Sequence, residues 1–217
     1  MINERSGSYG TFYGSPTGYS AVMTRAQMEV NAWYLHKALT SKGWSLGAIC
    51  ALLGNMEAES SINPGRWQGD TPGSTSLGYG LVQWTPSTKY TEWCSSQGLS
   101  DPSHIDSNIA RILYEVDNNI QWIAKSPYTF SFKYFTTSTE SVSSLAKAFL
   151  LCYERPADQS DSAQNYRSSL ATAWYKYLVG SDPPDGPGSI TRKKKKSNYF
   201  LLFNQRKRRQ QWIKKPF

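Results

Sequence analysis

One apolar segment with helical periodicity constrains the fold of this 217-residue chain more than any other feature. Ser45 stands before the segment as a helix-capping residue, and the triplet Asn63-Pro64-Gly65 ends it. Its apolar residues recur every three or four positions, at Leu46, Ile49, Cys50, Leu53 and Met56. We therefore predict a central, buried helix around which the rest of a domain packs.

Further helical patterns lie on both sides of this segment in the sequence. Thr24 and Gln27 have the spacing of a capping box, which predicts a helix that ends near Gly43. Apolar periodicity also predicts helices at about 87–97, 104–123, 140–153 and 162–179. Residues 64–84 are rich in glycine and contain the alternating GYGLVQW, which predicts turns and a short strand. The expected fold class is mainly α, an α+β arrangement with a small β element.

Composition divides the chain into four parts. Residues 1–22 are predicted to form a flexible, extended N-terminal arm, because they are rich in Gly, Ser and Tyr. Residues 23–180 are predicted to form one helical domain. The sequence SDPPDGPGS at 181–189 is typical of a linker. Residues 190–217 form a basic tail that we expect to be disordered.

The net charge of +8 comes from this tail. Residues 189–217 hold 11 of the 24 Lys and Arg and no Asp or Glu, so residues 1–188 hold 13 basic and 16 acidic residues. Specific nucleic-acid recognition by the domain is therefore not expected. Two hypotheses remain for the tail. Either it binds anionic wall polymer, anionic lipid or DNA, or it is a functionless product of a shifted or truncated reading frame.

Cysteine and histidine usage argues against several kinds of site. Cys50, Cys94 and Cys152 are widely spaced within apolar patterns, so we predict three buried free thiols. The chain has only two histidines and no zinc-binding motif, so no metal and no cofactor are expected. The first 25 residues contain no apolar core of signal-peptide length, which favours synthesis in a cytoplasm without standard export.

Two glutamates near the end of the central helix are the first candidates for chemistry. Glu57 and Glu59 lie about 200° apart around a helix axis, so they cannot both face one cleft. Glu57 is nearer the middle of the apolar stripe, whereas Glu59 is at its flank. Partial burial at a flank raises the pKa of a carboxyl group, as a general acid near neutral pH requires. Periodicity alone does not choose between the two.

The GYGLVQW segment at 78–84 supplies groups of a second kind. Its glycines allow a ligand to approach the backbone closely. Gln83 offers a donor and an acceptor, and Tyr79 and Trp84 offer aromatic rings. This assortment suits N-acetylated sugars, which present an acetamide group and apolar ring faces. A glycine-rich hairpin with a buried tryptophan is the alternative interpretation.

Three motifs in order resemble those of the phage tail-associated lysozymes: GNMEAESSINPGRWQ, SLGYGLVQWTPSTKY and YERPAD. The likeness is closest to the tail-tip peptidoglycan hydrolases of phi29-like podophages and runs from about Met28 to Gly180. It implies a lysozyme-like fold with a small β element beside an active-site cleft. It also implies cleavage of the β-1,4 bond between N-acetylmuramic acid and N-acetylglucosamine, with Glu59 as the catalytic glutamate and general acid.

The resemblance extends to residues around the implied cleft. The predicted substrate-binding set is Gly78, Tyr79, Gly80, Gln83, Trp84, Tyr153 and Glu154. Glu154 and Arg155 equally fit a structural ion pair. Many glycosidases need a second carboxylate, and Asp70 is the candidate on sequence position only. Without one, a transglycosylase-like route or substrate-assisted attack would replace simple hydrolysis.

The first functional hypothesis is therefore a virion-associated muramidase that lets a phage tail pass the cell wall. Its expected partners are peptidoglycan glycan strands and other tail proteins. Its expected location is the tail tip of the virion, after synthesis in the host cytoplasm. The alternatives are a structural or wall-binding tail-tip protein without activity, a lytic transglycosylase, and a free endolysin. In the phi29-like tail-tip hydrolases that the chain resembles, a metallo-endopeptidase domain follows the linker, whereas the basic tail here has no His or acidic residue.

Overall fold

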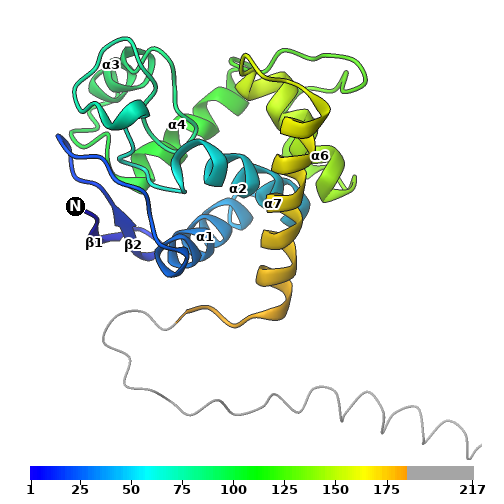
Figure 1. Ribbon diagram of the computed structural model, residues 1–217, viewed down its shortest axis with the longest axis horizontal. Helices are drawn as coiled ribbons and strands as arrows, with labels where there is room; N and C mark the ends of the chain where they lie inside the picture. Colours follow the sequence, from blue (N-terminus) through cyan, green and yellow to red (C-terminus); the bar gives the residue numbers. More distant parts are fainter. Residues whose placement is uncertain (185–217) are drawn as a thin grey trace, which may run out of the picture. The chain divides into compact units, whose positions relative to one another are not determined.

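The computed structural model describes residues 1–184, in which seven α-helices accompany one two-stranded sheet (Figure 1). The elements in chain order are β1 (Asn3–Gly7), β2 (Gly10–Gly14), α1 (Arg25–Thr40), α2 (Leu46–Ser60), the 3-10 turn η1 (Gln68–Asp70), α3 (Thr88–Ser96), α4 (Ile105–Asp117), α5 (Phe132–Thr137), α6 (Val142–Phe149), the π-helical turn η2 (Leu150–Glu154) and α7 (Asp161–Gly180). The prediction of a mainly α fold with a small β element is confirmed.

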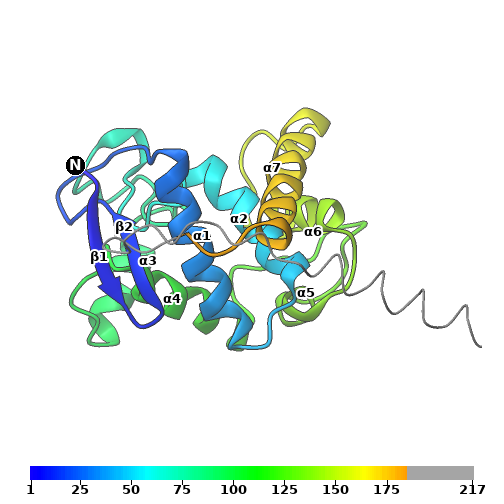
Figure 2. The same ribbon diagram turned by 90° about the horizontal axis from the view of Figure 1, so that it is seen from below.

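Helix α2 is the central helix of the fold. Every residue from Ala48 to Met56 is buried, and helices α1, α6 and α7 pack around it (Figure 2). Burying each large aliphatic side chain stabilises such a core by roughly 1.5–3 kcal/mol. Ser45 caps the helix by accepting a hydrogen bond from the Ala48 amide at 3.2 Å. The helix ends where Ser61 turns left-handed with φ 53°, so the predicted central helix is confirmed.

Helices α2 and α7 approach each other closely at Gly54. A Cβ atom at this position would lie 2.5 Å from the backbone nitrogen of Ala171, which is closer than two non-bonded heavy atoms can approach without a shift of one of them. A glycine on α2 therefore permits the close packing of the two helices. This packing places the first half of α7 alongside the last turn of α2.

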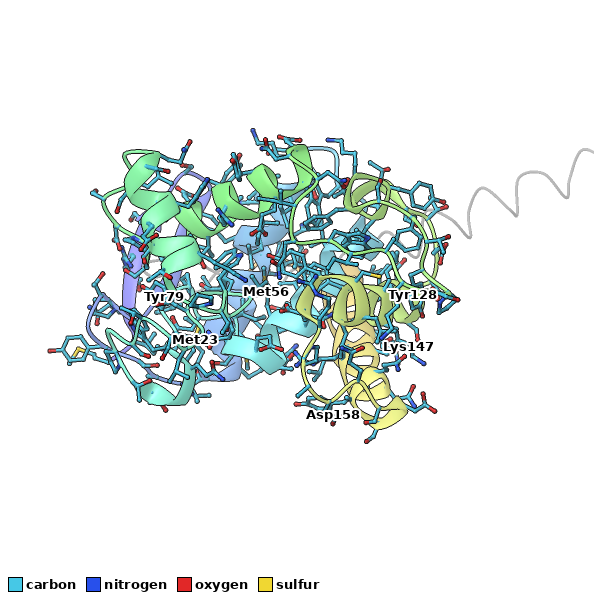
Figure 3. The ribbon with its side chains drawn as sticks, turned by 90° about the horizontal axis from the view of Figure 1, so that it is seen from above. Met23, Met56, Tyr79, Tyr128, Lys147 and Asp158 are labelled. Carbon is cyan, nitrogen blue, oxygen red and sulfur yellow. The ribbon has the colours of Figure 1, made fainter. Side chains whose placement is uncertain are left out.

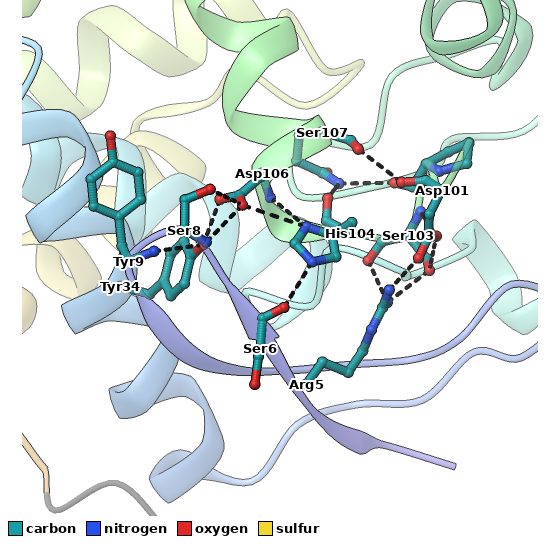
Figure 4. A network of polar contacts seen from close by, with 12 residues as sticks. Arg5, Ser6, Ser8, Tyr9, Tyr34, Asp101, Ser103, His104, Asp106 and Ser107 are labelled. Atoms are coloured by element: carbon teal, nitrogen blue, oxygen red, sulfur yellow. Dashed lines mark hydrogen bonds and ion pairs between the residues drawn. The ribbon is translucent and has the colours of Figure 1, made fainter. Parts of the chain in front are cut away.

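The N-terminal residues form a hairpin and not the extended arm that was predicted over residues 1–22. Strands β1 and β2 pair antiparallel between Asn3 and Gly14, and β2 packs on α1. Figure 4 shows how the hairpin is fastened to the start of α4. Arg5 forms an ion pair with Asp101, and the Ser8 amide donates to Asp106 at 2.9 Å. Sequence composition missed these contacts because they join residues about 100 positions apart.

The glycine-rich segment forms a tight loop and not the predicted short strand. Only isolated bridges occur there, from Tyr79 to Trp67 and from Tyr79 to Trp84. Gly80 with φ 86° and Gln83 with φ 50° turn the chain back within GYGLVQW. Its alternating apolar residues are buried because the loop folds into the core. The sheet of this fold is the hairpin at residues 3–14.

Other element boundaries differ from the predictions in smaller ways. Helix α4 ends at Asp117 and not near 123, because Asn119 and Gln121 adopt positive φ. Helix α5 was not predicted. Helix α6 continues into η2, whose wider turn ends at Glu154. The basic tail at 190–217 lies outside the described residues, and so does the part of the linker (181–189) that follows residue 184.

One further prediction concerns the cysteines of the core. Cys50, Cys94 and Cys152 are free and buried, as their apolar surroundings in the sequence predicted. Within residues 1–184, no helix combines the length and the apolar character needed to cross a membrane.

Candidate active site

A cleft of about 490 Å³ opens beside the C-terminal end of α2. Three segments form its walls: the last turn of α2, the loop between residues 66 and 85, and the end of η2 with the residues that follow it. The lining residues are Glu59, Arg66, Gln68, Gly69, Gln83, Thr85, Glu154, Arg155, Pro156 and Ala157. Of the predicted site residues, Glu59, Gln83 and Glu154 meet in this cleft.

Glu59 enters the cleft from the last turn of α2 as one half of an ion pair. Its Oε1 lies 2.6 Å from Nη2 of Arg167, and the two side chains are 20% and 12% exposed. Nη1 of Arg167 also donates to the carbonyl oxygen of Asn55 at 2.8 Å. The guanidinium is therefore fixed to α2 at two points. An ion pair of this kind requires Glu59 to be ionised.

Glu154 enters the same cleft from the end of η2 in a different environment. Part of the residue lines the cleft, but its Oε1 is buried and has no hydrogen-bond partner within residues 1–184. Burial raises the pKa of Glu154 well above the usual range, and the negative charge of Glu59 raises it further. The Arg167 and Arg155 charges oppose this shift only in part. This environment favours the neutral carboxyl form of Glu154.

The buried Glu115 of α4 holds two walls of the cleft together. Its Oε1 accepts from the Trp84 indole at 3.0 Å and from Arg111 at 2.9 Å, and its Oε2 accepts from the Tyr153 hydroxyl at 2.5 Å. Trp84 belongs to the glycine-rich loop and Tyr153 directly precedes Glu154. Both rings are almost fully buried, so they support the cleft from behind and do not line it.

The remaining residues of the glycine-rich loop shape its backbone. Tyr79, which is labelled in Figure 3, is 1% exposed and stacks on Trp67 with ring centroids 4.0 Å apart. It therefore offers no stacking face to a ligand. The Gly78 amide donates to the side-chain Oε1 of Gln68 at 2.8 Å, and the Gln68 amide donates to the Gly78 carbonyl oxygen at 2.9 Å. These contacts position Gln68, which does line the cleft.

Gln83 is the member of this loop whose side chain reaches the cleft. Its amide nitrogen donates to the carbonyl oxygens of Gly80 at 2.8 Å and Arg66 at 3.1 Å. The backbone nitrogen of Gly80 donates to the same Arg66 carbonyl at 2.9 Å. Both protons of the Gln83 amide are thus used within the loop, and its amide oxygen is the group suited to accept a hydrogen bond from a ligand.

Asp70 and Glu57 lie away from the cleft. The Asp70 side chain is 55% exposed and pairs with Arg66 at 3.2 Å, so only its partner is a lining residue. Glu57 accepts from the Trp174 indole at 2.7 Å, on the side of α2 that faces α7. The helical geometry that separates Glu57 from Glu59 is therefore realised in the fold.

Three arginines of the site were not found by sequence reasoning. Arg66 and Arg155 were visible in the motifs GRWQ and YERPAD, but no pattern assigned them to a wall of the cleft. Arg167 lies 108 positions after Glu59, and no local spacing connects the two. Among residues 1–184, no group of three His, Cys, Asp or Glu is arranged to hold a metal ion.

Comparison with known proteins agrees with this architecture. Residues 30–178 match the family model described as phage tail lysozyme. Over 161 residues the chain is 50% identical to "Morphogenesis protein 1" of Bacillus phage B103, which covers 74% of this chain and 42% of that protein. The chain thus spans less than half the length of this relative. The helical core, the cleft at the end of α2 and the extent of the match establish that the chain belongs to the phage tail lysozyme family.

Proposed function

We propose that this protein is a virion-associated peptidoglycan hydrolase that cleaves the β-1,4 bond between N-acetylmuramic acid and N-acetylglucosamine. One observation carries the proposal. Two carboxyl groups, Glu59 and Glu154, line one cleft in environments that favour different protonation states. Many glycosidases use this combination, in which one carboxyl protonates the leaving oxygen while a carboxylate stabilises the positive charge that develops on the sugar.

The cleft also offers groups that suit an N-acetylated sugar. The Gln83 amide oxygen is suited to accept a hydrogen bond from an acetamide or hydroxyl group. Arg66 and Arg155 supply positive charge to a wall that peptidoglycan, with its lactyl and peptide carboxylates, would contact. Asp70 is not retained as the second carboxyl, because its exposed side chain lies outside the lining and pairs with Arg66. Glu154 takes that place in the proposal.

The biological setting follows from the family and from the relative's name. The family is described as phage tail lysozyme, and the phage B103 relative is named for morphogenesis. We therefore propose glycan strands of the host wall as the substrate and other tail proteins as partners. The proposed location is the tail tip, and the particle delivers the enzyme after its synthesis in the host cytoplasm.

Digestion of purified peptidoglycan tests this function. Wild-type protein, Glu59→Gln and Glu57→Gln are incubated with the wall polymer, and the released fragments are read by mass spectrometry. Glu57→Gln is the matched control, because it makes the same chemical change on the same helix outside the cleft. We expect fragments with reducing muramic ends from the wild type and the control, and none from Glu59→Gln.

Other outcomes identify the alternatives. Anhydro-muramic ends would indicate a lytic transglycosylase that uses the same cleft. No release by the wild type would favour a structural or wall-binding tail part without activity. Detection of the protein in late lysates, but not in purified virions, would favour a free endolysin.

A further inference from the structure

We propose that Arg155 is a specificity-determining residue whose guanidinium binds a carboxylate carried by the muramic sugar of the substrate. This carboxylate is either the lactyl group of a peptide-free glycan strand or a carboxylate of the attached peptide. Its recognition would direct the cleft to peptidoglycan and away from uncharged polymers of N-acetylglucosamine. The inference rests on the proposed function and names the part of the substrate that one wall of the cleft recognises.

The first argument is the charge of Arg155, which has no acidic partner. Of the two arginines that line the cleft, Arg66 is paired with Asp70 at 3.2 Å. Arg155 forms no ion pair within residues 1–184, so the pair with Glu154 that the sequence also allowed is not made. Asp158, the next acidic residue along the chain, is exposed at the outer edge of the molecule (Figure 3). The cleft therefore contains a guanidinium whose charge is available to a ligand.

The second argument is the way in which the guanidinium is held. Nη1 of Arg155 donates to the carbonyl oxygens of Gln121 and Cys152, the latter at 2.8 Å. These two bonds use both protons of Nη1. The side-chain amide of Gln121 in turn donates to the carbonyl oxygen of Tyr153 at 3.1 Å, which ties its segment to η2. One end of the guanidinium is therefore fixed by two segments of backbone.

The opposite edge of the Arg155 guanidinium, formed by Nε and Nη2, makes no hydrogen bond with any described residue. Its two N–H groups point in parallel and match the two oxygens of a carboxylate, so a two-pronged, charge-assisted contact can form there. Because Nη1 is already anchored, little side-chain freedom remains to be lost when a ligand binds. The fold thus presents a carboxylate-binding edge in a cleft wall.

The third argument is the backbone at Arg155. The residue adopts φ 49° and ψ 50°, a left-handed conformation in which glycine is the usual residue at the end of a helix. Pro156 follows, and a proline favours an extended conformation in the residue before it. Strained backbone of this kind recurs at ligand-binding sites. A glycine would end η2 with less strain, so the turn by itself does not require an arginine.

The chemistry of the two sugars shows what such an edge can distinguish. Both carry an acetamide group, so a contact with Gln83 cannot separate them. Muramic acid differs by a lactyl ether, whose carboxyl group is ionised in bare strands and amide-linked to a peptide in intact wall. Arg155 lines the same cleft as Glu59 and Glu154. A carboxylate held by Arg155 would therefore belong to a sugar close to the bond that is cleaved.

Binding of three glycans tests this recognition without turnover. Full-length Glu59→Gln, with and without Arg155→Gly, is titrated in a calorimeter with peptide-free glycan strands, peptide-bearing strands without cross-links, and uncharged chito-oligosaccharide of similar length. We expect Arg155→Gly to weaken binding of carboxylate-bearing strands by about 10–100-fold, the usual range for a charged hydrogen-bonding group, and to leave binding of the chito-oligosaccharide nearly unchanged.

The two carboxylate-bearing ligands identify the group that is recognised. Weaker binding of the peptide-free strands would assign the lactyl carboxylate, and weaker binding of the peptide-bearing strands alone would assign a carboxylate of the peptide. Equal weakening for all three glycans, or none for any of them, would overturn the proposal.

Three variants serve as controls for the loss of the side chain. Glycine adopts φ 49° without strain, so Arg155→Gly should stay folded, and urea unfolding checks this. Arg155→Lys keeps the charge but lacks the paired N–H groups, so it should retain only part of the preference for carboxylate-bearing strands. Lys176→Gln removes one exposed positive charge of α7 outside the cleft lining and should bind all three glycans as its parent does.

Digestion separates this inference from the proposed function. If the wild type releases muramic ends, and Arg155→Gly loses no more activity on glycan strands than Lys176→Gln does, recognition by Arg155 is refuted and the hydrolase stands. If the wild type releases nothing, but its preference for carboxylate-bearing strands depends on Arg155, the proposed function fails and the recognition stands.

Discussion

Replacement of Glu115 tests whether one buried carboxylate holds the walls of the cleft together. Glu115 is fully buried and accepts hydrogen bonds from Trp84, Arg111 and Tyr153. In Glu115→Ala these three donors lose their acceptor in the core. Removing one partner of a buried ion pair costs about 3–5 kcal/mol, because the remaining charge is left uncompensated. This is a large share of the roughly 5–15 kcal/mol by which a domain is stable.

Two other variants calibrate that number. Glu115→Gln keeps one amide oxygen for Trp84 or Arg111 but presents an NH₂ group toward Tyr153, so we expect a loss of about 1.5–3 kcal/mol. Asp117→Ala, two positions along α4, removes a pair with Lys133 at 3.6 Å in which both side chains are about 70% exposed. Such a surface pair contributes less than about 1 kcal/mol.

Urea unfolding followed by tryptophan fluorescence measures all three variants against the wild type. We expect the order Glu115→Ala, Glu115→Gln, Asp117→Ala, from the largest to the smallest loss of unfolding free energy. Peptidoglycan release should fall in the two Glu115 variants, because Trp84 and Tyr153 position two walls of the cleft. If Glu115→Ala were no less stable than Asp117→Ala, the hydrogen bonds around Glu115 would contribute nothing measurable to the stability of the fold.

Three further perturbations address other parts of the fold. Glu57→Gln should keep most of the peptidoglycan-releasing activity, because an amide oxygen can still accept a hydrogen bond from Trp174. A loss as large as that of Glu59→Gln would contradict the placement of Glu57 outside the active site. Gly54→Ala should lower the unfolding free energy by about 1–3 kcal/mol in urea titrations, because the new Cβ meets the backbone of α7. The cost of this overpacking exceeds the gain of about 1 kcal/mol that alanine brings in helix propensity. A more stable variant would show that α7 moves aside freely. Burial alone would raise the pKa of Asp106, but hydrogen bonds from Tyr34 and Ser8 lower it. The contribution of Asp106 to the unfolding free energy is therefore complete above about pH 4 and is lost as the pH falls through the lowered pKa. Asp106→Asn should make the unfolding free energy depend less steeply on pH in the acid range. An unchanged pH dependence would refute this.

The central part of the fold could be predicted because it depends on local patterns. The capping box of Thr24 and Gln27 is formed as the sequence indicated. Helix α2 begins directly after the capping residue Ser45 and ends before the helix-breaking Pro64, as these two residues predicted. These signals act within a few positions of the chain, so spacing alone reveals them.

The parts that sequence reasoning missed depend on contacts between distant residues. The hairpin at residues 3–14 is held by Asp101 and Asp106, which lie about 100 positions away. Tyr79 and Trp84 share a motif with Gln83, yet only Gln83 faces the cleft, because positive φ angles at Gly80 and Gln83 turn the loop. No alternation rule anticipates such a turn. The environments of the cleft carboxyl groups likewise depend on burial that appears only in the folded chain.

The position of Arg167 on α7 has a consequence for how the cleft is made. A ribosome completes α2, the glycine-rich loop and η2 before it adds the helix whose arginine pairs with Glu59. Nascent chains that lack α7 carry both cleft glutamates but not the cation that pairs with Glu59. The ion pair of Glu59 therefore forms late in synthesis, and a break between η2 and α7 would separate Glu59 from Arg167 although every residue that lines the cleft lies before the break.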